Sequence, residues 1–160
     1  MNTGKIFEKS FRKSIPDSEN VYCYRLKDGT ASWNIGNSKN VRFQAENIAD
    51  FFLFYDKYLL ILELKSHKGK SLPLNKVRSN QVKEMTEASK KLGVIPFLIV
   101  FFSDIERCFA LRINTFNDFV ENSDRKSIPL SFFEEKAIEI GVKKLKTNYK
   151  FDINSFLEEF

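Results

Sequence analysis

Asp50, Glu63 and Lys65 are the residues whose types and spacing could do chemistry in this chain. Glu63 and Lys65 end a short apolar run, YLLILELK at residues 58–65, which is typical of a buried strand. Because side chains alternate along a strand, Glu63 and Lys65 point to the same face. A carboxylate and an ammonium at the end of an apolar strand are costly unless they pair or bind something.

Asp50 precedes a second apolar segment at residues 51–54, and Asp56 and Lys57 follow it as the expected hairpin turn. Antiparallel pairing of the two segments brings Asp50 back near Glu63. Two acids and a lysine then meet at one place. These groups can hold a divalent metal ion on oxygen ligands and activate a water molecule beside it.

Length and composition limit the kind of protein. The 160 residues predict a single domain, 1–160, and 42% hydrophobic residues with 17 Phe favour a well-packed globular protein. A net charge of +5 and a pI of about 9.1 favour a polyanionic partner. Cys23 and Cys108 lie far apart, so we expect free thiols in a reducing cytosol. Neither a signal peptide nor a membrane-spanning run is apparent, which predicts a soluble, cytoplasmic protein.

Hydrophobic periodicity and end signals predict the elements that position these residues. We expect strands at residues 21–27, 51–54, 58–65, 94–102, 107–113 and 144–153. We expect one helix at residues 4–14, with Thr3 as N-cap, and a second from Asn75 or Ser79 to Leu92, before Gly93. A third helix is expected to run to about Val120 with Asn114 as N-cap. Two more are expected from Ser131, which has capping-box spacing, and from Asn154. Residues 30–47 and 66–74 are predicted to be loops. A strand, a long helix and a strand normally form a crossover, so we expect an α/β fold with a mixed central sheet flanked by helices.

Glu8 has a local interpretation that depends on its spacing from Arg12. It lies four residues before Arg12 on the first predicted helix, and this spacing by itself favours a solvated ion pair.

The pattern of Asp50, twelve residues, and then Glu-x-Lys is the signature of the PD-(D/E)xK nucleases, with Ala49 in place of the proline. Further segments occur in order: GKIFE at 4–8, DFF at 50–52, ELKS at 63–66, LPL at 72–74, Gln81 with Met85, GVIPFLIVFF at 93–102 and KSIPL at 126–130. This series resembles the RecU-type Holliday junction resolvases of Gram-positive bacteria and their phages, from residue 4 to about residue 130.

The resemblance implies a restriction-endonuclease-like (PD-(D/E)xK) fold and a role for each matching residue. Asp50 and Glu63 would coordinate the metal, and Lys65 would orient or deprotonate the attacking water or stabilise developing charge. Glu8 would match the family's helix-borne acid, which completes or tunes the metal site, and this replaces its interpretation as a solvated pair. Gln81 would contact the site from the long helix.

The resemblance also implies Mg²⁺ as cofactor, with Mn²⁺ as a substitute, and a homodimer that cuts four-way DNA junctions in recombination and repair. Basic residues on the flanking elements are the predicted DNA contacts, through phosphates and without sequence readout. They are Lys5, Lys9, Arg12, Lys13, Lys68, Lys70, Lys76 and Arg78.

One stretch departs from the family pattern. Family members carry a long protruding stalk before the aspartate strand, and the corresponding residues 27–47 are fewer here and are not rich in proline and lysine. Two alternatives to a junction resolvase follow: a nuclease of the same fold that acts on other DNA structures or on duplex, and a non-catalytic DNA-binding recombination factor. The intact set of Asp50, Glu63 and Lys65 argues against the second.

Overall fold

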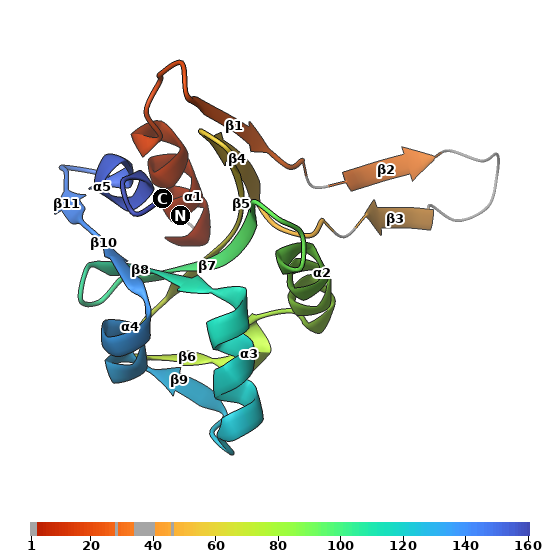
Figure 1. The fold of residues 1–160 in the computed structure, drawn as a ribbon, viewed down its shortest axis with the longest axis vertical. Coiled ribbons are helices and arrows are strands. Elements are labelled where there is room, and N and C mark those ends of the chain that lie inside the picture. Colours follow the sequence, from red (N-terminus) through yellow and green to blue (C-terminus); the bar gives the residue numbers. More distant parts are fainter. Residues whose placement is uncertain (1–2, 28, 34–40, 46) are drawn as a thin grey trace.

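A six-stranded mixed sheet forms the centre of the computed structural model, in the order β1-β4-β5-β7-β8-β10 (Figure 1). The structure describes the backbone of residues 3–27, 29–33, 41–45 and 47–160, and the side chains of residues 3–27 and 47–160. Neighbouring strands are antiparallel except for β5 and β7, which are parallel and joined through α2. The expected mixed α/β sheet with helices on both faces is confirmed.

The helices and strands are bounded as follows. The helices are α1 (Thr3–Ser14), η1 (Leu74–Lys76, a 3-10 turn), α2 (Ser79–Ser89), α3 (Ile113–Asn122), α4 (Leu130–Lys136) and α5 (Ile153–Leu157). The strands are β1 (Val21–Arg25), β2 (Gly29–Trp33), β3 (Val41–Ala45), β4 (Phe51–Tyr55), β5 (Tyr58–His67), β6 (Ser71–Pro73), β7 (Val94–Phe102), β8 (Arg107–Arg112), β9 (Ser127–Pro129), β10 (Ile138–Ile140), β11 (Val142–Lys144) and β12 (Tyr149–Phe151).

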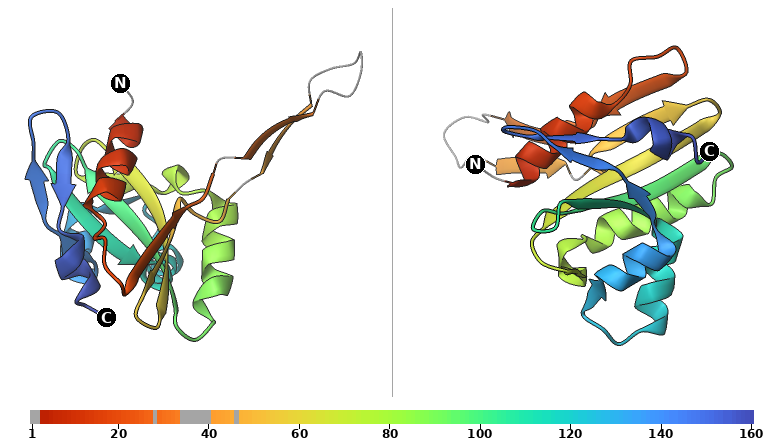
Figure 2. Two further views of the ribbon diagram at one scale, coloured as in Figure 1. Left: turned by 90° about the horizontal axis from the view of Figure 1, so that it is seen from above. Right: turned by 90° about the vertical axis from the view of Figure 1, so that its left-hand side faces the viewer.

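Strand β7 explains why the chain folds into two layers around this sheet. Phe97, Ile99 and Phe101 pack under α1, α5 and β12, whereas Leu98 and Val100 pack under α2, α3 and α4 (Figure 2). All five side chains are buried. The most apolar run of the sequence therefore forms the central strand, because a strand that is covered on both faces exposes neither face to water and needs no polar side.

The β4–β5 hairpin has the register that the sequence predicted. Phe51 lies opposite Leu62 and Tyr55 opposite Tyr58, so Asp56 and Lys57 form the two-residue turn. Asp56 has φ 53°, a left-handed conformation that Asp tolerates better than most residues. This register places Asp50, one residue before β4, beside the second half of β5.

The sequence predicted a loop at residues 30–47, but residues 29–33 and 41–45 form two strands. β2 and β3 pair antiparallel, from Gly29 opposite Ala45 to Trp33 opposite Val41, and form a ribbon that projects from the body of the molecule (Figures 1 and 2). Their polar composition suggested a loop, but a ribbon satisfies its backbone by pairing and does not need an apolar face. The other predicted loop residues, 34–40 and 46, lie outside the described part of the chain.

Five other expectations were wrong. β6 pairs with β9, so part of the predicted basic loop at residues 66–74 is a strand, and β5 extends to His67. Helix α2 ends at Ser89 rather than Leu92, which is fully exposed. Asn114 lies inside α3, after Arg112 as N-cap, and Ser131 lies inside α4, after Pro129. Residues 144–153 are not one strand: they form the end of β11, the turn after it, β12, and then Asp152 and Ile153 at the start of α5.

Candidate active site

Glu63 is the centre of a polar cluster inside the α2-facing layer. Its carboxylate is buried and accepts hydrogen bonds from Lys65 Nζ to Oε1 at 2.6 Å and from Gln81 Nε2 to Oε2 at 2.9 Å. Leu62 and Leu64 belong to the opposite, α1-facing core. The predicted shared direction of Glu63 and Lys65 is thus confirmed, and each carboxylate oxygen has a donor, as burial of a charge requires.

Asp50 joins this cluster from the start of β4. Its amide donates to Leu62 O at 3.1 Å, and its carboxylate Oδ2 accepts from Leu64 N at 2.7 Å. Its Oδ1 makes no hydrogen bond to another described residue. Asp50 is therefore bound to the residues on both sides of Glu63, through its amide to Leu62 and through its carboxylate to Leu64, and Oδ1 is left for a ligand.

Burial and neighbouring charge raise the pKa of Asp50 from 3.8 to about 7. Desolvation is the largest cause and the negative charge of Glu63 the next, and the charge of Glu8 acts in the same direction. The hydrogen bond from Leu64 and the charge of Lys65 lower the pKa but do not compensate. Burial and the charges of Glu63 and Glu8 therefore disfavour the ionised form of Asp50, and acids perturbed in this way are common at functional sites.

Glu8 reaches the same region from the other layer. Its carboxylate accepts a hydrogen bond from Arg25 Nε and forms an ion pair with it, and not with Arg12, which the helical spacing by itself favoured. Arg25 lies on the less exposed side of β1, opposite Phe51. The role of Glu8 as a metal ligand stays a prediction, and its carboxylate is held by Arg25 in this structure.

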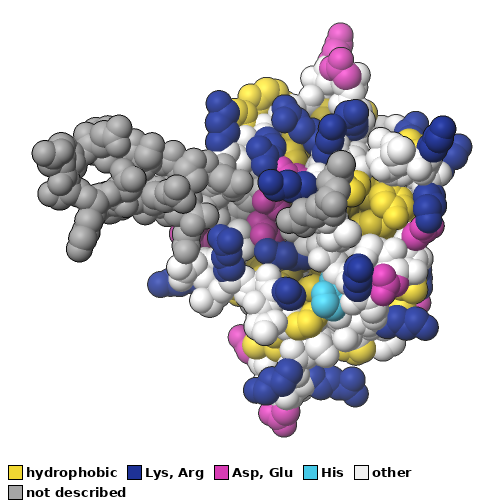
Figure 3. Space-filling view, turned by 180° about the vertical axis from the view of Figure 1, so that it is seen from behind, with side chains coloured by type: hydrophobic (Ala, Val, Ile, Leu, Met, Phe, Trp, Pro, Cys, Tyr) yellow, Lys and Arg dark blue, Asp and Glu magenta, His cyan; other side chains and the backbone are white. Residues whose placement is uncertain are grey.

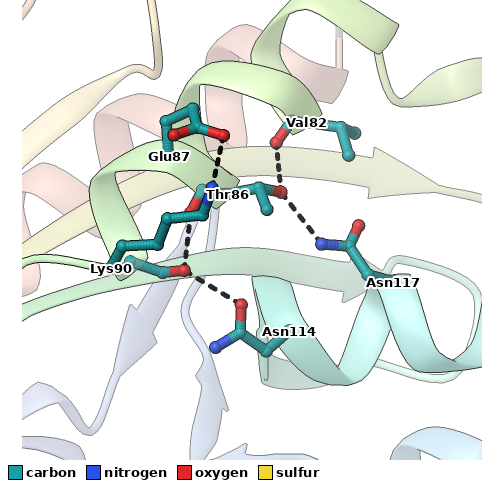
Figure 4. Close-up of polar contacts among 7 residues, drawn as sticks. Val82, Thr86, Glu87, Lys90, Asn114 and Asn117 are labelled. Atoms are coloured by element: carbon teal, nitrogen blue, oxygen red, sulfur yellow. Dashed lines mark hydrogen bonds and ion pairs between the residues drawn. The ribbon is translucent and has the colours of Figure 1, made fainter.

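Helix α2 is fixed in place by polar contacts with α3. Thr86 donates to Val82 O at 2.6 Å and accepts from Asn117 Nδ2 at 2.9 Å (Figure 4). Ser89 donates to Asn114 Oδ1 at 3.0 Å. Because Gln81 lies on the first turn of the same helix, these contacts position its amide against Glu63.

Lys and Arg side chains gather around a group of acidic side chains on the face seen in Figure 3. The predicted DNA contacts occupy three places, and all are exposed: α1, the segment after β5, and the region from η1 to the start of α2. They are Lys5, Lys9, Arg12 and Lys13 on α1, Lys68 and Lys70 after β5, Lys76 in η1 and Arg78 before α2. Their contact with DNA stays a prediction.

Comparison with known proteins assigns the chain to a family. The model of the family described as "Recombination protein U" (RecU) matches residues 21–155, which include Asp50, Glu63, Lys65 and Gln81. The chain belongs to the RecU family.

Two relatives match this chain, one of which is named as a RecU. The SPbeta prophage-derived protein YotM of Bacillus subtilis (strain 168) is 30% identical over 173 aligned positions, which cover 99% of this chain and 86% of YotM. The Holliday junction resolvase RecU of Pediococcus pentosaceus is 31% identical over 106 residues, which cover 64% of this chain and 52% of that protein. Among solved structures, the Holliday junction resolvase Hjc of Archaeoglobus fulgidus superposes with a TM-score of 0.47 and 12% identity, over 75% of this chain and 83% of Hjc.

The polar cluster of Asp50, Glu63, Lys65 and Gln81 contains two carboxylates, which are groups that bind a hard cation. Among the described residues, no group of three or more Asp, Glu, His or Cys side chains lies close enough to hold a metal ion. Mg²⁺ does not need such a cage, since it commonly binds one or two carboxylates and completes its shell with water and substrate phosphate. Asp50 and Glu63 are the two carboxylates of this cluster, and their role as metal ligands stays a prediction.

Arg25 is the residue at this site that the sequence did not single out. It is the last residue of β1 and the only charged one in that strand, on the inward side of an alternating pattern. This position was the available signal, because a charge on the inner side of a strand implies a partner in the neighbouring layer. The sequence could not show that the partner is Glu8.

Proposed function

We propose that this RecU-family chain is a metal-dependent endodeoxyribonuclease that resolves four-way DNA junctions by hydrolysing phosphodiester bonds. The observation that carries the proposal is the buried carboxylate of Glu63, which accepts hydrogen bonds from Lys65 and Gln81 and lies near Asp50. Burying an acid next to a second acid destabilises a fold. A protein that only binds DNA has no use for this arrangement, whereas a hydrolase uses it for a cation.

Asp50 and Glu63 would hold Mg²⁺, for which Mn²⁺ can substitute. When bound, such an ion polarises the phosphate and lowers the pKa of a water molecule. Two carboxylates supply oxygen ligands of the kind that hard cations bind, and a cation beside Asp50 would offset the negative charges of Glu63 and Glu8.

Lys65 and Gln81 would orient the reacting groups. The side chain of Lys65 is only 19% exposed and its ammonium donates to Glu63, so it lies beside a carboxylate that would hold the cation. It would orient the attacking water or donate to a phosphate oxygen that gains charge. Gln81 would keep the Glu63 carboxylate in one orientation through its hydrogen bond.

The family supports a four-way junction as the substrate, and the symmetry of a junction supports a homodimer. A relative named as a Holliday junction resolvase shares 31% identity with this chain. A four-way junction has two-fold symmetry, and a homodimer would place two equivalent sites on its opposed strands. The exposed lysines and arginines around the acidic group would bind the backbone phosphates.

Cleavage of a four-way junction, a flap and a linear duplex in Mg²⁺ or Mn²⁺ tests the proposal. We expect wild type to cut the junction in paired strands and Asp50→Asn to bind it in Ca²⁺ without cutting it. Asp118→Asn, an exposed change on α3, is the matched control and should cut normally. Undiminished cleavage by Asp50→Asn would remove Asp50 from the mechanism, and equal cleavage of junction and duplex would indicate a general duplex nuclease instead.

A further inference from the structure

A hollow of about 320 Å³ between α1 and β1 is lined by charged side chains: Lys5, Glu8, Lys9, Arg12 and Arg25. Lys5, Lys9 and Arg12 follow one another at spacings of four and three residues, so they share one face of α1. All three are exposed, and Glu8 is the single acid in the lining. A concave surface with four cations and one anion favours a ligand with negative charge.

Arg25 closes this hollow from the sheet side. Its guanidinium pairs with Glu8, and the two side chains are 36% and 23% exposed. A pair that is partly open to solvent contributes little to stability, typically about 0–1 kcal/mol. A phosphate is a stronger partner for a guanidinium, because two parallel N–H donors match two of its oxygens.

The hollow adjoins the candidate active site through the backbone. The residue after Arg25 donates its amide to Asp50 O at 2.8 Å, and Arg25 itself lies opposite Phe51, the first residue of β4. A DNA strand that reaches Asp50 and Glu63 would therefore pass this end of β1.

We propose that the hollow binds a backbone phosphate of the DNA substrate and that Arg25 exchanges Glu8 for this phosphate on binding. This inference rests on the proposed function, since it assumes that DNA is the ligand. Lys5, Lys9 and Arg12 surround the phosphate with positive charge, and Glu8 holds the guanidinium in place when DNA is absent. The site reads no sequence, because a phosphate is the same at every step of the strand.

DNA binding in EDTA tests the exchange without any metal-dependent step. A fluorescently labelled four-way junction and a linear duplex are titrated with wild type, Arg25→Gln, Glu8→Gln and the double variant, at several salt concentrations. We expect Arg25→Gln to weaken binding of both DNAs about 8-fold at 0.1 M salt and to reduce the slope of log K against log salt by about 0.9, the value of one phosphate contact. Arg107→Gln is the matched control, since Arg107 is an ion-paired arginine of similar exposure (32%) on β8 and should leave the slope unchanged.

The double variant distinguishes the exchange of Glu8 for a phosphate at Arg25 from simple repulsion between Glu8 and the DNA. Glu8→Gln removes the carboxylate that competes with phosphate for Arg25 and should tighten binding about 2- to 5-fold in the wild-type background. This gain should disappear when Arg25 is already glutamine. A gain that persists in the double variant, or an unchanged salt slope in Arg25→Gln, would overturn the proposal while leaving the nuclease assignment intact. Wild type that neither binds nor cuts junctions would refute the proposed function itself.

Discussion

Replacing Asp50 with asparagine measures the electrostatic cost that the candidate metal site imposes on the fold. The folded protein raises the pKa of Asp50 from 3.8 to about 7, mainly by burial and by the charge of Glu63. Between these two pH values the folded state keeps a proton that the unfolded state has lost. The free energy of unfolding of wild type therefore falls as the pH rises from about 4 to about 7, and the full cost remains above pH 7.

The magnitude follows from the pKa difference. At about 1.4 kcal/mol for each pKa unit, the rise from 3.8 to about 7 corresponds to about 4 kcal/mol. Asparagine has nearly the same shape and cannot ionise, and its Oδ1 can still accept from Leu64 N. We expect Asp50→Asn to match wild type near pH 4 and to be more stable by up to about 4 kcal/mol at pH 8, or about 10 °C in Tm for a chain of this size.

Urea denaturation followed by circular dichroism, in EDTA between pH 4 and pH 8, measures this difference. Asp118→Asn serves again as the control and should follow wild type at every pH. Excess Mg²⁺ at pH 8 should then stabilise wild type, by about 2.7 kcal/mol at one hundred times its Kd, and leave Asp50→Asn almost unchanged. A stability difference that is the same at pH 5 and pH 8 would refute the electrostatic reasoning.

Two further substitutions separate the parts of the candidate site. Lys65→Met removes one of the two donors to the buried Glu63, and we expect junction cleavage to fall at least about 100-fold while binding in Ca²⁺ changes less than about 3-fold; equal losses in binding and cleavage would make Lys65 a binding residue. Gln81→Met removes the other donor, and we expect a loss of about 1–3 kcal/mol in unfolding free energy together with a lower kcat; unchanged stability would show that Gln81 does not support Glu63.

The core elements of the site were readable from the sequence because their signals are local. The apolar runs at β5 and β7, the two-residue turn at Asp56, and the alternation that turns Glu63 and Lys65 to one face depend on neighbours in the chain. The short hairpin also fixed the register, so the approach of Asp50 to Glu63 was predictable. These features account for the meeting of Asp50, Glu63 and Lys65, whereas their catalytic roles were inferred from the family resemblance.

Pairing between distant segments was decided only by the tertiary structure. Nothing near β6 indicates that residues 127–129 will pair with it, and the polar composition around β2 and β3 hid a ribbon. The partner of Glu8 shows the same limit: helical spacing pointed to Arg12, but Arg25 reaches it from a strand in the next layer. A charged side chain that faces inward takes whichever opposite charge the fold places beside it, and sequence spacing carries no information about that choice.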